Sequence, residues 1–579
     1  MHKFWLNSLL FRPAILAAMM VVAIPAIASA ESAPTNSDSI GQLTSVSQLS
    51  DVKPSDWAFQ SLQSLVERYG CIAGYPDKTF RGNRALTRYE FAAGLNACLD
   101  QINQLIAVGT TDLAKKEDLE TIKRLQEEYA EELATIRGQV DALEARTATL
   151  ESQQFSTTTK LRGEVIFGVA SPFGSDLATN SDNWRIINAA PPAARNAVRA
   201  AIFGPRGSKL NDNFIFGDRV RLNFDTSFTG QDRLRVRLQA RNITQFDAVS
   251  GVNAVTGTNQ TRLGFDGGGA TNNAVSASVI SYRFPVSDAT TVHVGAYGLE
   301  FVDEVPTLSR NFDSSGSGAV SRFGRYNPIY RSTDSGTGVI VNHKFNDALT
   351  LSAGYLVPDN TANNPAAGNG LLNGSYSALG QLTYQATPQL SLAATYANSY
   401  YSSPTDTDAR ITGATGTTFA NNPFNGARTS TNSYSLAANY RLNPSVQITA
   451  WGGFTKATAE RTVAAPAVDP TAGNKAEIWN WAVQLGLPDF GGEGNFAGIV
   501  FGVPPHVASN SYSSTAAPFA AVPARRLDTD TSYHLEAFYK YKFSDNITIT
   551  PGLITIFNPE GNSNNPATYV GVVRTTFSF

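Results

Sequence analysis

The stretch of sequence that decides the fold is residues 219–241, RVRLNFDTSFTGQDRLRVRLQAR. Polar or charged residues alternate with apolar ones from Arg219 to Asp225, and arginine alternates with Leu or Val from Arg233 onward. Such alternation places the two kinds of side chain on opposite faces of a strand. The residues TGQD at 229–232 fit a short hairpin connection. The stretch therefore predicts two antiparallel strands with one apolar face and one face rich in arginine.

The same pattern continues to Phe579. Short connections such as 345–348 alternate with long connections rich in Asn, Gly, Ser and Thr such as 401–432, an order typical of outer-membrane barrels. We therefore expect a mainly β fold, an antiparallel transmembrane β-barrel of about 16 strands, each near the ~9–11 residues that a tilted membrane strand needs. The strands are expected at 160–170, 217–228, 233–244, 276–286, 290–301, 336–345, 348–357, 376–386, 389–400, 433–442, 445–455, 476–487, 496–503, 531–543, 547–557 and 569–579.

The composition agrees with many half-apolar strands joined by turns. Only 16% of the 579 residues are charged, whereas the chain has 47 glycines, 32 phenylalanines and 21 tyrosines. The formal net charge of -3 gives no basic field that would attract nucleic acid. After the N-terminal segment no run reaches the roughly 18 apolar residues of a transmembrane helix, so membrane crossing would use strands.

The N-terminal segment has the features of a signal peptide. A basic stretch containing Lys3 precedes an apolar run at 14–27, and a small-residue cleavage site follows at 28–30. The run is shorter than the ~20 residues of a spanning helix, which disfavours the alternative of a membrane anchor. We expect residues 1–30 to be the signal peptide and residues 31–45 to be a polar tether.

Residues 46–108 predict a pair of helices. Gly70 ends the first helix, which has one apolar face made of Trp57, Leu62, Leu65, Val66 and Tyr69. Thr87 and Glu90 have the spacing of a capping box at the start of the second helix. The face that this second helix is expected to bury consists of Phe91, Leu95 and Leu99.

Parts of this helical module resemble the S-layer homology (SLH) motif. They are LSDV at 49–52, Trp57 and GCIAGYPDKTFRGNRALTRYE at 70–90. The resemblance implies a domain, here 46–108, that binds peptidoglycan or its linked polysaccharide without catalysis. The chain departs from the motif in having Leu49 where an aromatic residue is usual, and in having one copy where several are common.

The same resemblance implies the roles of single residues. Trp57 and Arg88 match the positions of the glycan contacts, whereas Asp51 and Glu90 match positions with structural roles. The alternative for Arg88 is that it pairs with Glu90 or caps the helix.

Cys71 and Cys98 are the two cysteines of the chain, and both lie in this module. In an exported protein such a placement favours a disulfide, which would contribute roughly 3 kcal/mol. A metal site is disfavoured because no histidine is close in the sequence. We expect no metal and no cofactor anywhere in the chain.

Residues 109–155 contain no proline and carry a heptad pattern. The a and d positions are Leu119/Ile122, Gln126/Tyr129, Leu133/Ile136, Val140/Leu143 and Thr147/Leu150. The pattern predicts a coiled coil, and β-branched residues at d favour a homotrimer. The alternative is one long amphipathic helix that lies on its own chain.

The charged faces of the strands are expected to point into the barrel, because a Lys or Arg facing lipid costs ~2–4 kcal/mol near the midplane. Arginines on adjacent strands would then line one wall of the lumen, where a positive field attracts anions and guanidinium groups bind carboxylate, phosphate or sugar hydroxyls. The alternative is that they only pair with acidic residues on constricting loops. These expected pore-lining residues are Arg219, Arg221, Arg233, Arg235, Arg237 and Arg241.

Two long loops, 171–213 and 302–335, are the expected constrictors of the lumen. The second loop brings acidic and basic residues together, and such residues facing each other across a lumen screen solutes by charge. Its candidate constriction residues are Asp303, Glu304, Arg322 and Arg325.

The order of signal peptide, SLH motif, coiled coil and barrel at 156–579 resembles the cyanobacterial outer-membrane porins, whose barrel is related to the OprB-type carbohydrate-selective porins. The resemblance implies an outer-membrane protein whose SLH domain lies in the periplasm. The expected function is passive diffusion of small hydrophilic solutes, inorganic ions or sugars. The alternative is a structural tether with a plugged barrel. An enzyme is not expected, since the four histidines of the barrel region fall in no catalytic motif.

Overall fold

The computed structural model describes residues 45–69, 75, 77–108, 116–153, 158–204, 207–247, 255–267, 272–402, 411–460, 472–513 and 523–579. The chain divides into two compact units, Met1–Gln154 and Phe155–Phe579, and each is described by itself. The expected signal peptide at 1–30, and all of the expected tether except Ser45, lie outside the described residues.

The described part of the first unit up to residue 108 has three short helices, one longer helix and a small core. The helices are η2 (Val46–Gln48), α1 (Phe59–Gln63), the π-helix η3 (Ser64–Arg68) and α2 (Arg88–Val108). The core is Val46, Leu49, Leu62 and Val66, with Phe80 packed against it. The expected capping box is confirmed, because Thr87 N donates to Glu90 Oε2 over 2.8 Å and Glu90 N donates to Thr87 Oγ1 over 3.2 Å.

Two expectations for this unit are wrong. Trp57 precedes helix α1 and is 65% exposed instead of joining the apolar face. The expected buried face of α2 is about half exposed, with Phe91 at 48%, Leu95 at 49% and Leu99 at 49%. The physical reason is that residues 46–66 and Phe80 form the core among themselves, so in the described part of the unit the apolar stripe of α2 stays outside that core.

The expected coiled-coil segment contains α3 (Lys116–Gln153), a helix of 38 residues. Five side chains at the predicted a and d positions are largely exposed in the single chain: Leu119 (59%), Ile122 (48%), Tyr129 (47%), Ile136 (48%) and Leu143 (64%). None of the helices in the described ranges is both long and apolar enough to cross a membrane.

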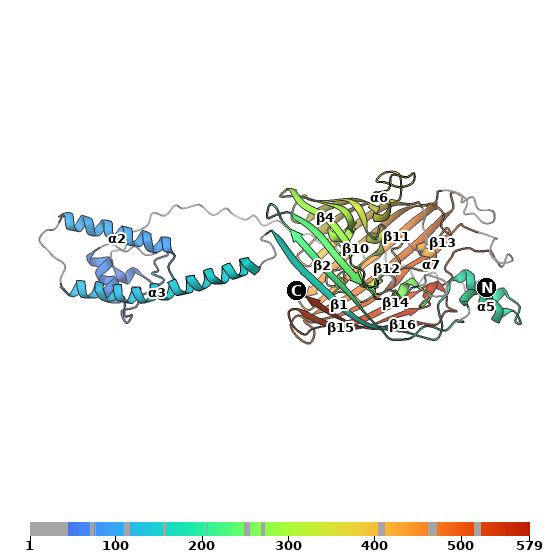
Figure 1. The fold of residues 1–579 in the computed structure, drawn as a ribbon, viewed down its shortest axis with the longest axis horizontal. Helices are drawn as coiled ribbons and strands as arrows, with labels where there is room; N and C mark the ends of the chain where they lie inside the picture. Colours follow the sequence, from blue (N-terminus) through green and yellow to red (C-terminus); the bar gives the residue numbers. More distant parts are fainter. Residues whose placement is uncertain are drawn as a thin grey trace, which may run out of the picture. The chain divides into compact units, whose positions relative to one another are not determined.

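The second unit is a closed barrel (Figure 1). Each strand pairs antiparallel with its neighbours in the sequence, and β1 closes the barrel on β16. The expected fold class is thus confirmed. The strands are β1 (Thr159–Phe173), β2 (Ile215–Thr226), β3 (Arg233–Arg241), β4 (Ser276–Ser287), β5 (Thr290–Leu299), β6 (Gly336–Lys344), β7 (Leu349–Pro358), β8 (Tyr376–Gln385), β9 (Leu390–Tyr401), β10 (Thr429–Asn443), β11 (Val446–Ala459), β12 (Lys475–Pro488), β13 (Phe496–Asn510), β14 (Tyr533–Lys542), β15 (Ile547–Phe557) and β16 (Thr568–Ser578).

The outer face of the barrel carries large apolar side chains. Tyr396, Tyr434, Phe454 and Trp479 form a row of ring contacts across neighbouring strands, with centroids 4.3–6.5 Å apart. Three of these side chains, Tyr396, Tyr434 and Trp479, are more than 40% exposed in the chain by itself. Exposed aromatic residues in a row across neighbouring strands are typical of a lipid-facing surface.

Strand β13 is longer than expected. The expected strand ended at residue 503, directly before Pro504 and Pro505, and proline lacks the N–H that a ladder needs. The strand nevertheless runs to Asn510, because β12 pairs with it that far. On the other edge β14 pairs only with residues 496–502, so loops contact the rest. There Thr417 N donates to Pro505 O over 3.0 Å.

Short helices lie in the long connections: α4 (Ser181–Ala189), α5 (Arg195–Phe203), α6 (Asp359–Ala362) and α7 (Thr418–Asn421). Inside the barrel, an apolar cluster includes Phe265, Phe312, Val320, Phe323 and Phe538. Phe312 meets Phe538 edge-on with ring centroids 5.7 Å apart. The cluster therefore joins two long connections to the inner face of the wall.

Candidate pore constriction

The connection between β5 and β6, residues 300–335, lies across the interior of the barrel and is called the inward loop. Tyr330 and Arg331 in this loop are nearly completely buried. The loop bonds to strands far from its own ends: Tyr330 Oη to Gln381 Oε1 of β8 (2.7 Å), Asn327 Nδ2 to Ser435 Oγ of β10 (2.8 Å) and Gln484 Nε2 of β12 to Gly324 O (2.7 Å). A loop bonded to several strands narrows the lumen.

The structure brings the six predicted pore-lining arginines together on β2 and β3. Arg219 lies opposite Arg241, Arg221 opposite Gln239, Asn223 opposite Arg237 and Asp225 opposite Arg235. Arg233 lies opposite Arg283 of β4. Because directly opposite residues share a face of the sheet, all six point to the side on which Arg219 and Arg221 contact the inward loop. These six residues are called the arginine wall.

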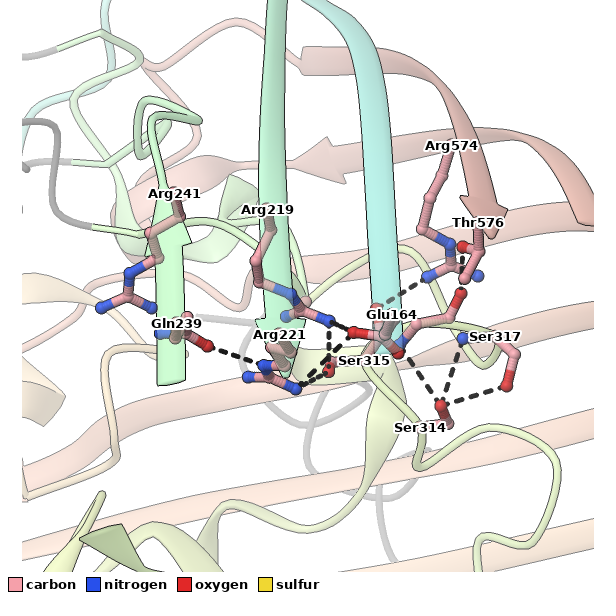
Figure 2. A network of polar contacts seen from close by, with 12 residues as sticks. Glu164, Arg219, Arg221, Gln239, Arg241, Ser314, Ser315, Ser317, Arg574 and Thr576 are labelled. Carbon is pink, nitrogen blue, oxygen red and sulfur yellow. Dashed lines mark hydrogen bonds and ion pairs between the residues drawn. The ribbon is translucent and has the colours of Figure 1, made fainter. Parts of the chain in front are cut away.

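Figure 2 shows the part of the arginine wall that meets the inward loop. Arg219 donates to Glu164 Oε1 of β1 over 2.7 Å and to Ser315 Oγ over 3.0 Å. Arg221 donates to Gln239 Oε1 over 2.6 Å and to the same Ser315 Oγ over 3.2 Å. One serine of the loop therefore joins two arginines of the wall.

The rest of the arginine wall binds groups on the strands and on a second loop. Arg235 makes a two-pronged ion pair with Asp225, at 2.7 and 2.8 Å. Arg237 donates to Asn223 Oδ1 over 2.8 Å, and Arg241 donates to Asp266 O over 3.2 Å. The carboxylates that form ion pairs with the wall in the described residues, Glu164 and Asp225, thus come from strands.

The four predicted constriction residues do not form one facing group. Glu304 pairs with Arg283 of β4 at 2.9 Å and with His293 of β5 at 3.2 Å. Asp303 bonds to Glu300 N at the start of the loop, at 2.9 Å. Arg322 pairs with Asp334 within the loop, and Arg325 donates to Asp313 O over 2.6 Å. The four charged residues therefore hold the inward loop at separate places and do not face one another across the lumen.

The other expected constrictor, 171–213, makes contacts with two further long connections. Thr179 N donates to Asn565 Oδ1 over 3.1 Å, and Trp184 Nε1 donates to the same oxygen over 2.7 Å. Ser181 Oγ and Thr529 Oγ1 are 3.1 Å apart. This loop and the segments near Thr529 and Asn565 therefore hold one another together.

Residues that the sequence did not single out complete the constriction. Glu164 is one, and a Cβ atom at Gly316 would lie 2.2 Å from its Oε2, so the loop backbone comes close to the end of this side chain. Arg574 and Glu536 are two more, and both are 0% exposed. Strand parity was the one signal that could have found them, since each is a charged residue on the inward side of an alternating strand.

In the first unit, Trp57 is exposed and Arg88 begins α2 at an exposed position. The cation beside Glu90 is Arg84, at 2.9 Å. Asp51 accepts hydrogen bonds from Phe80 N at 2.6 Å and Arg81 N at 2.5 Å, which closes the turn before α2.

Cys98 is disulfide-bonded. Cys71, the other cysteine of the sequence, lies outside the described residues. The pairing of Cys71 with Cys98 stays a prediction.

Comparison with protein families assigns both units. The model of the carbohydrate-selective porin, OprB family, matches residues 116–579. The chain belongs to this family. A model of the S-layer homology domain matches residues 48–92, which confirms the SLH resemblance of the first unit. The protein is an outer-membrane porin anchored to the cell wall through its SLH domain.

Relatives cover this porin to different extents. An uncharacterised protein of Nostoc sp. (strain PCC 7120) is 42% identical over 550 residues, which are 93% of this chain and 86% of the relative. Outer membrane protein SlpA of Thermus thermophilus is 36% identical over 163 residues, 27% of this chain and 17% of the relative. Among solved structures, OprB of Pseudomonas putida is 12% identical with a TM-score of 0.45, over 76% of this chain and 97% of that chain.

Acid is expected to loosen the start of α2 in the SLH domain of this porin. Hydrogen bonds from the backbone and hydroxyl of Thr87 lower the pKa of Glu90 from 4.5 to about 2. A carboxylate whose pKa is lowered on folding stabilises the fold only while ionised. Its contribution is therefore complete above about pH 4.5 and is lost as the pH falls toward 2. Hydrogen exchange at Thr87 N, corrected for its intrinsic pH dependence, should accelerate over this window.

The control for this pH dependence is Glu90→Gln, which keeps the shape of the side chain and cannot titrate. Exchange at Thr87 N in that variant should show no extra acceleration below pH 4.5. An identical acid profile in both proteins would contradict the assignment to Glu90.

Proposed function

We propose that this porin gives passive diffusion to small hydrophilic solutes and inorganic ions, with anions preferred. The observation that supports it is the arginine wall: six guanidinium groups share one face of β2 and β3. Within the described residues their ion pairs are with Glu164 and Asp225, whereas Asp303 and Glu304 of the inward loop interact with the wall without forming an ion pair. Arg237 binds a neutral amide, so its charge is not cancelled by its hydrogen-bond partner. An excess of fixed positive charge in a narrow aqueous path raises the local concentration of anions. Sugars are a further class of solute, since guanidinium groups also bind hydroxyl oxygens.

We propose that the working form is a homotrimer joined through α3. The exposed a and d side chains of that helix support this, because an apolar seam that one chain leaves in water gains free energy by packing against copies of itself. The SLH domain binds peptidoglycan or its linked polysaccharide, with Trp57 and Arg88 as the contacts. The barrel is bound by lipid of the outer membrane.

The test of diffusion is single-channel recording in a planar bilayer under a salt gradient. The native protein should give conductance steps in groups of three and a reversal potential of the sign for anion preference. Arg235→Glu/Arg237→Glu should lower the anion-to-cation permeability ratio several-fold, since it changes the wall by four charges. Lys344→Glu/Arg441→Glu makes the same change in net charge at exposed strand ends and should leave the ratio nearly unchanged.

A second candidate function is a structural tether with a plugged barrel. The observation that favours it is the burial of the inward loop, where Tyr326, Ile329, Tyr330 and Arg331 are each at most 7% exposed. Absence of conductance from folded native trimers would support the tether and overturn the proposed diffusion.

A further inference from the structure

The tip of the inward loop, residues 315–321, contacts two buried charges of opposite sign on the barrel wall. The first is Arg574 of β16. Its guanidinium donates to Gly318 O over 2.7 Å, to Ser315 O over 3.2 Å and to Ala319 O over 3.4 Å. The side chain is 0% exposed. Its hydrogen bonds go to peptide carbonyl groups of the tip, and Glu536 and Glu164 also stabilise its positive charge without a hydrogen bond to it.

The second charge is Glu536 of β14, also 0% exposed. Its Oε1 accepts hydrogen bonds from Val320 N at 2.6 Å and Ser321 N at 3.2 Å, and its Oε2 accepts one from Ser321 Oγ. A Cβ atom at Gly324 would lie 2.2 Å from Oε2, so the loop backbone approaches the carboxylate closely. The negative charge is therefore stabilised by N–H groups of the tip.

The two charges bind opposite ends of the peptide dipoles in one short segment. Arg574 donates to the carbonyl groups of residues 315, 318 and 319, and Glu536 accepts from the N–H groups of residues 320 and 321. A buried charge that loses its compensating groups is strongly destabilising. Displacement of the tip would remove the hydrogen bonds that it makes with both charges at once, so each charge depends on the segment that the other helps to hold.

We propose that Arg574 and Glu536 are a matched pair of positioning residues that sets the aperture of the pore by holding the tip of the inward loop. This inference rests on the proposed diffusion function. The same tip supplies Ser315 Oγ to Arg219 and Arg221 (Figure 2). Movement of the tip would therefore change the arginine wall as well as the width of the lumen, and conductance and ion selectivity should change together.

The experiment compares Arg574→Met, Glu536→Gln and the double variant with the native trimer. Each single variant should change single-channel conductance at least twofold and add fluctuation between substates, because the tip is released on one side. In the double variant the change in conductance should be much smaller than the sum of the changes in the two single variants. The reason is that neither buried charge is left without its opposite partner. Arg574→Lys keeps the positive charge but loses the planar guanidinium group that donates to several carbonyl groups. Its conductance should therefore lie between those of Arg574→Met and the native protein.

The matched control is Thr576→Val on the same strand. Thr576 Oγ1 donates to Gly316 O over 2.6 Å, so this variant removes a neutral bond to the same tip. Its conductance should stay within about a third of the native value. Native conductance and native noise in folded trimers of both single variants would overturn the proposal.

A second readout separates this inference from the diffusion function. Ser317, partly exposed in the tip, is replaced by cysteine in each background, and its rate of maleimide labelling is measured in folded trimers. Arg574→Met and Glu536→Gln should label at least fivefold faster than the native background. Failure of every protein to conduct, with labelling still accelerated, would overturn diffusion and leave the positioning pair standing. Equal labelling in all backgrounds would overturn the pair.

Discussion

Ile122→Lys/Ile136→Lys is expected to dissociate the oligomer. Both side chains are 48% exposed in the single chain, at d positions of α3. Burial of that remaining surface contributes roughly 5–9 kcal/mol for the six side chains of a trimer, and lysine at the same positions opposes it with charge. Light scattering of the detergent-solubilised protein should show a shift from trimer mass to monomer mass.

The matched control is Thr121→Lys/Thr135→Lys, which adds the same charge at two c positions of the same heptads. These positions lie away from the seam, so the trimer should persist. Trimers that survive in the double isoleucine variant would show that the barrels associate by themselves and that α3 is a spacer. That outcome would contradict the proposed role of the helix in assembly.

Trp57→Ala/Arg88→Ala is expected to abolish cosedimentation with purified peptidoglycan sacculi. Both side chains are exposed, and Trp57 lies outside the core of the SLH unit, so the fold should be retained. An aromatic ring and a guanidinium group at a glycan contact each contribute about 1–3 kcal/mol. The apparent affinity should therefore fall at least tenfold.

The comparison variant is Gln60→Ala/Arg68→Ala, which removes one exposed polar and one exposed cationic side chain from the same unit. It should sediment like the native protein. Equal sedimentation of all three proteins would show that these two positions do not contact the cell wall. Binding would then depend on other exposed residues of the unit, such as Tyr89.

The barrel could be predicted because its signal is local. Alternation with a period of two identifies a strand and its two faces, so the parity of residues 219–241 also placed the six arginines on one face. The heptads of 119–150 are local in the same way. The paired charges Arg235 and Asp225 lie only ten positions apart across a short turn, and strand register brings them together.

The contacts of the inward loop could not be predicted from the sequence in the same way, because they join distant parts of the chain. Val320 and Glu536 are separated by 216 positions, and Gly318 and Arg574 by 256. No periodicity in the loop indicates which strand it meets. The prediction that Phe91, Leu95 and Leu99 are buried was wrong for a related reason. A sequence pattern shows that a helix face is apolar but not whether the same chain covers it.

The second half of β13 affects how prone this protein is to aggregate while it folds. Beyond Gly502 the strand has no β14 partner, and an open edge of that kind is a template on which another chain can add a strand and begin to aggregate. Here Pro505 has no N–H to donate, its carbonyl accepts from Thr417 N over 3.0 Å, and Asp528 accepts the Val507 N–H over 2.7 Å. The proline and the two loop contacts thus protect this edge from pairing with another chain.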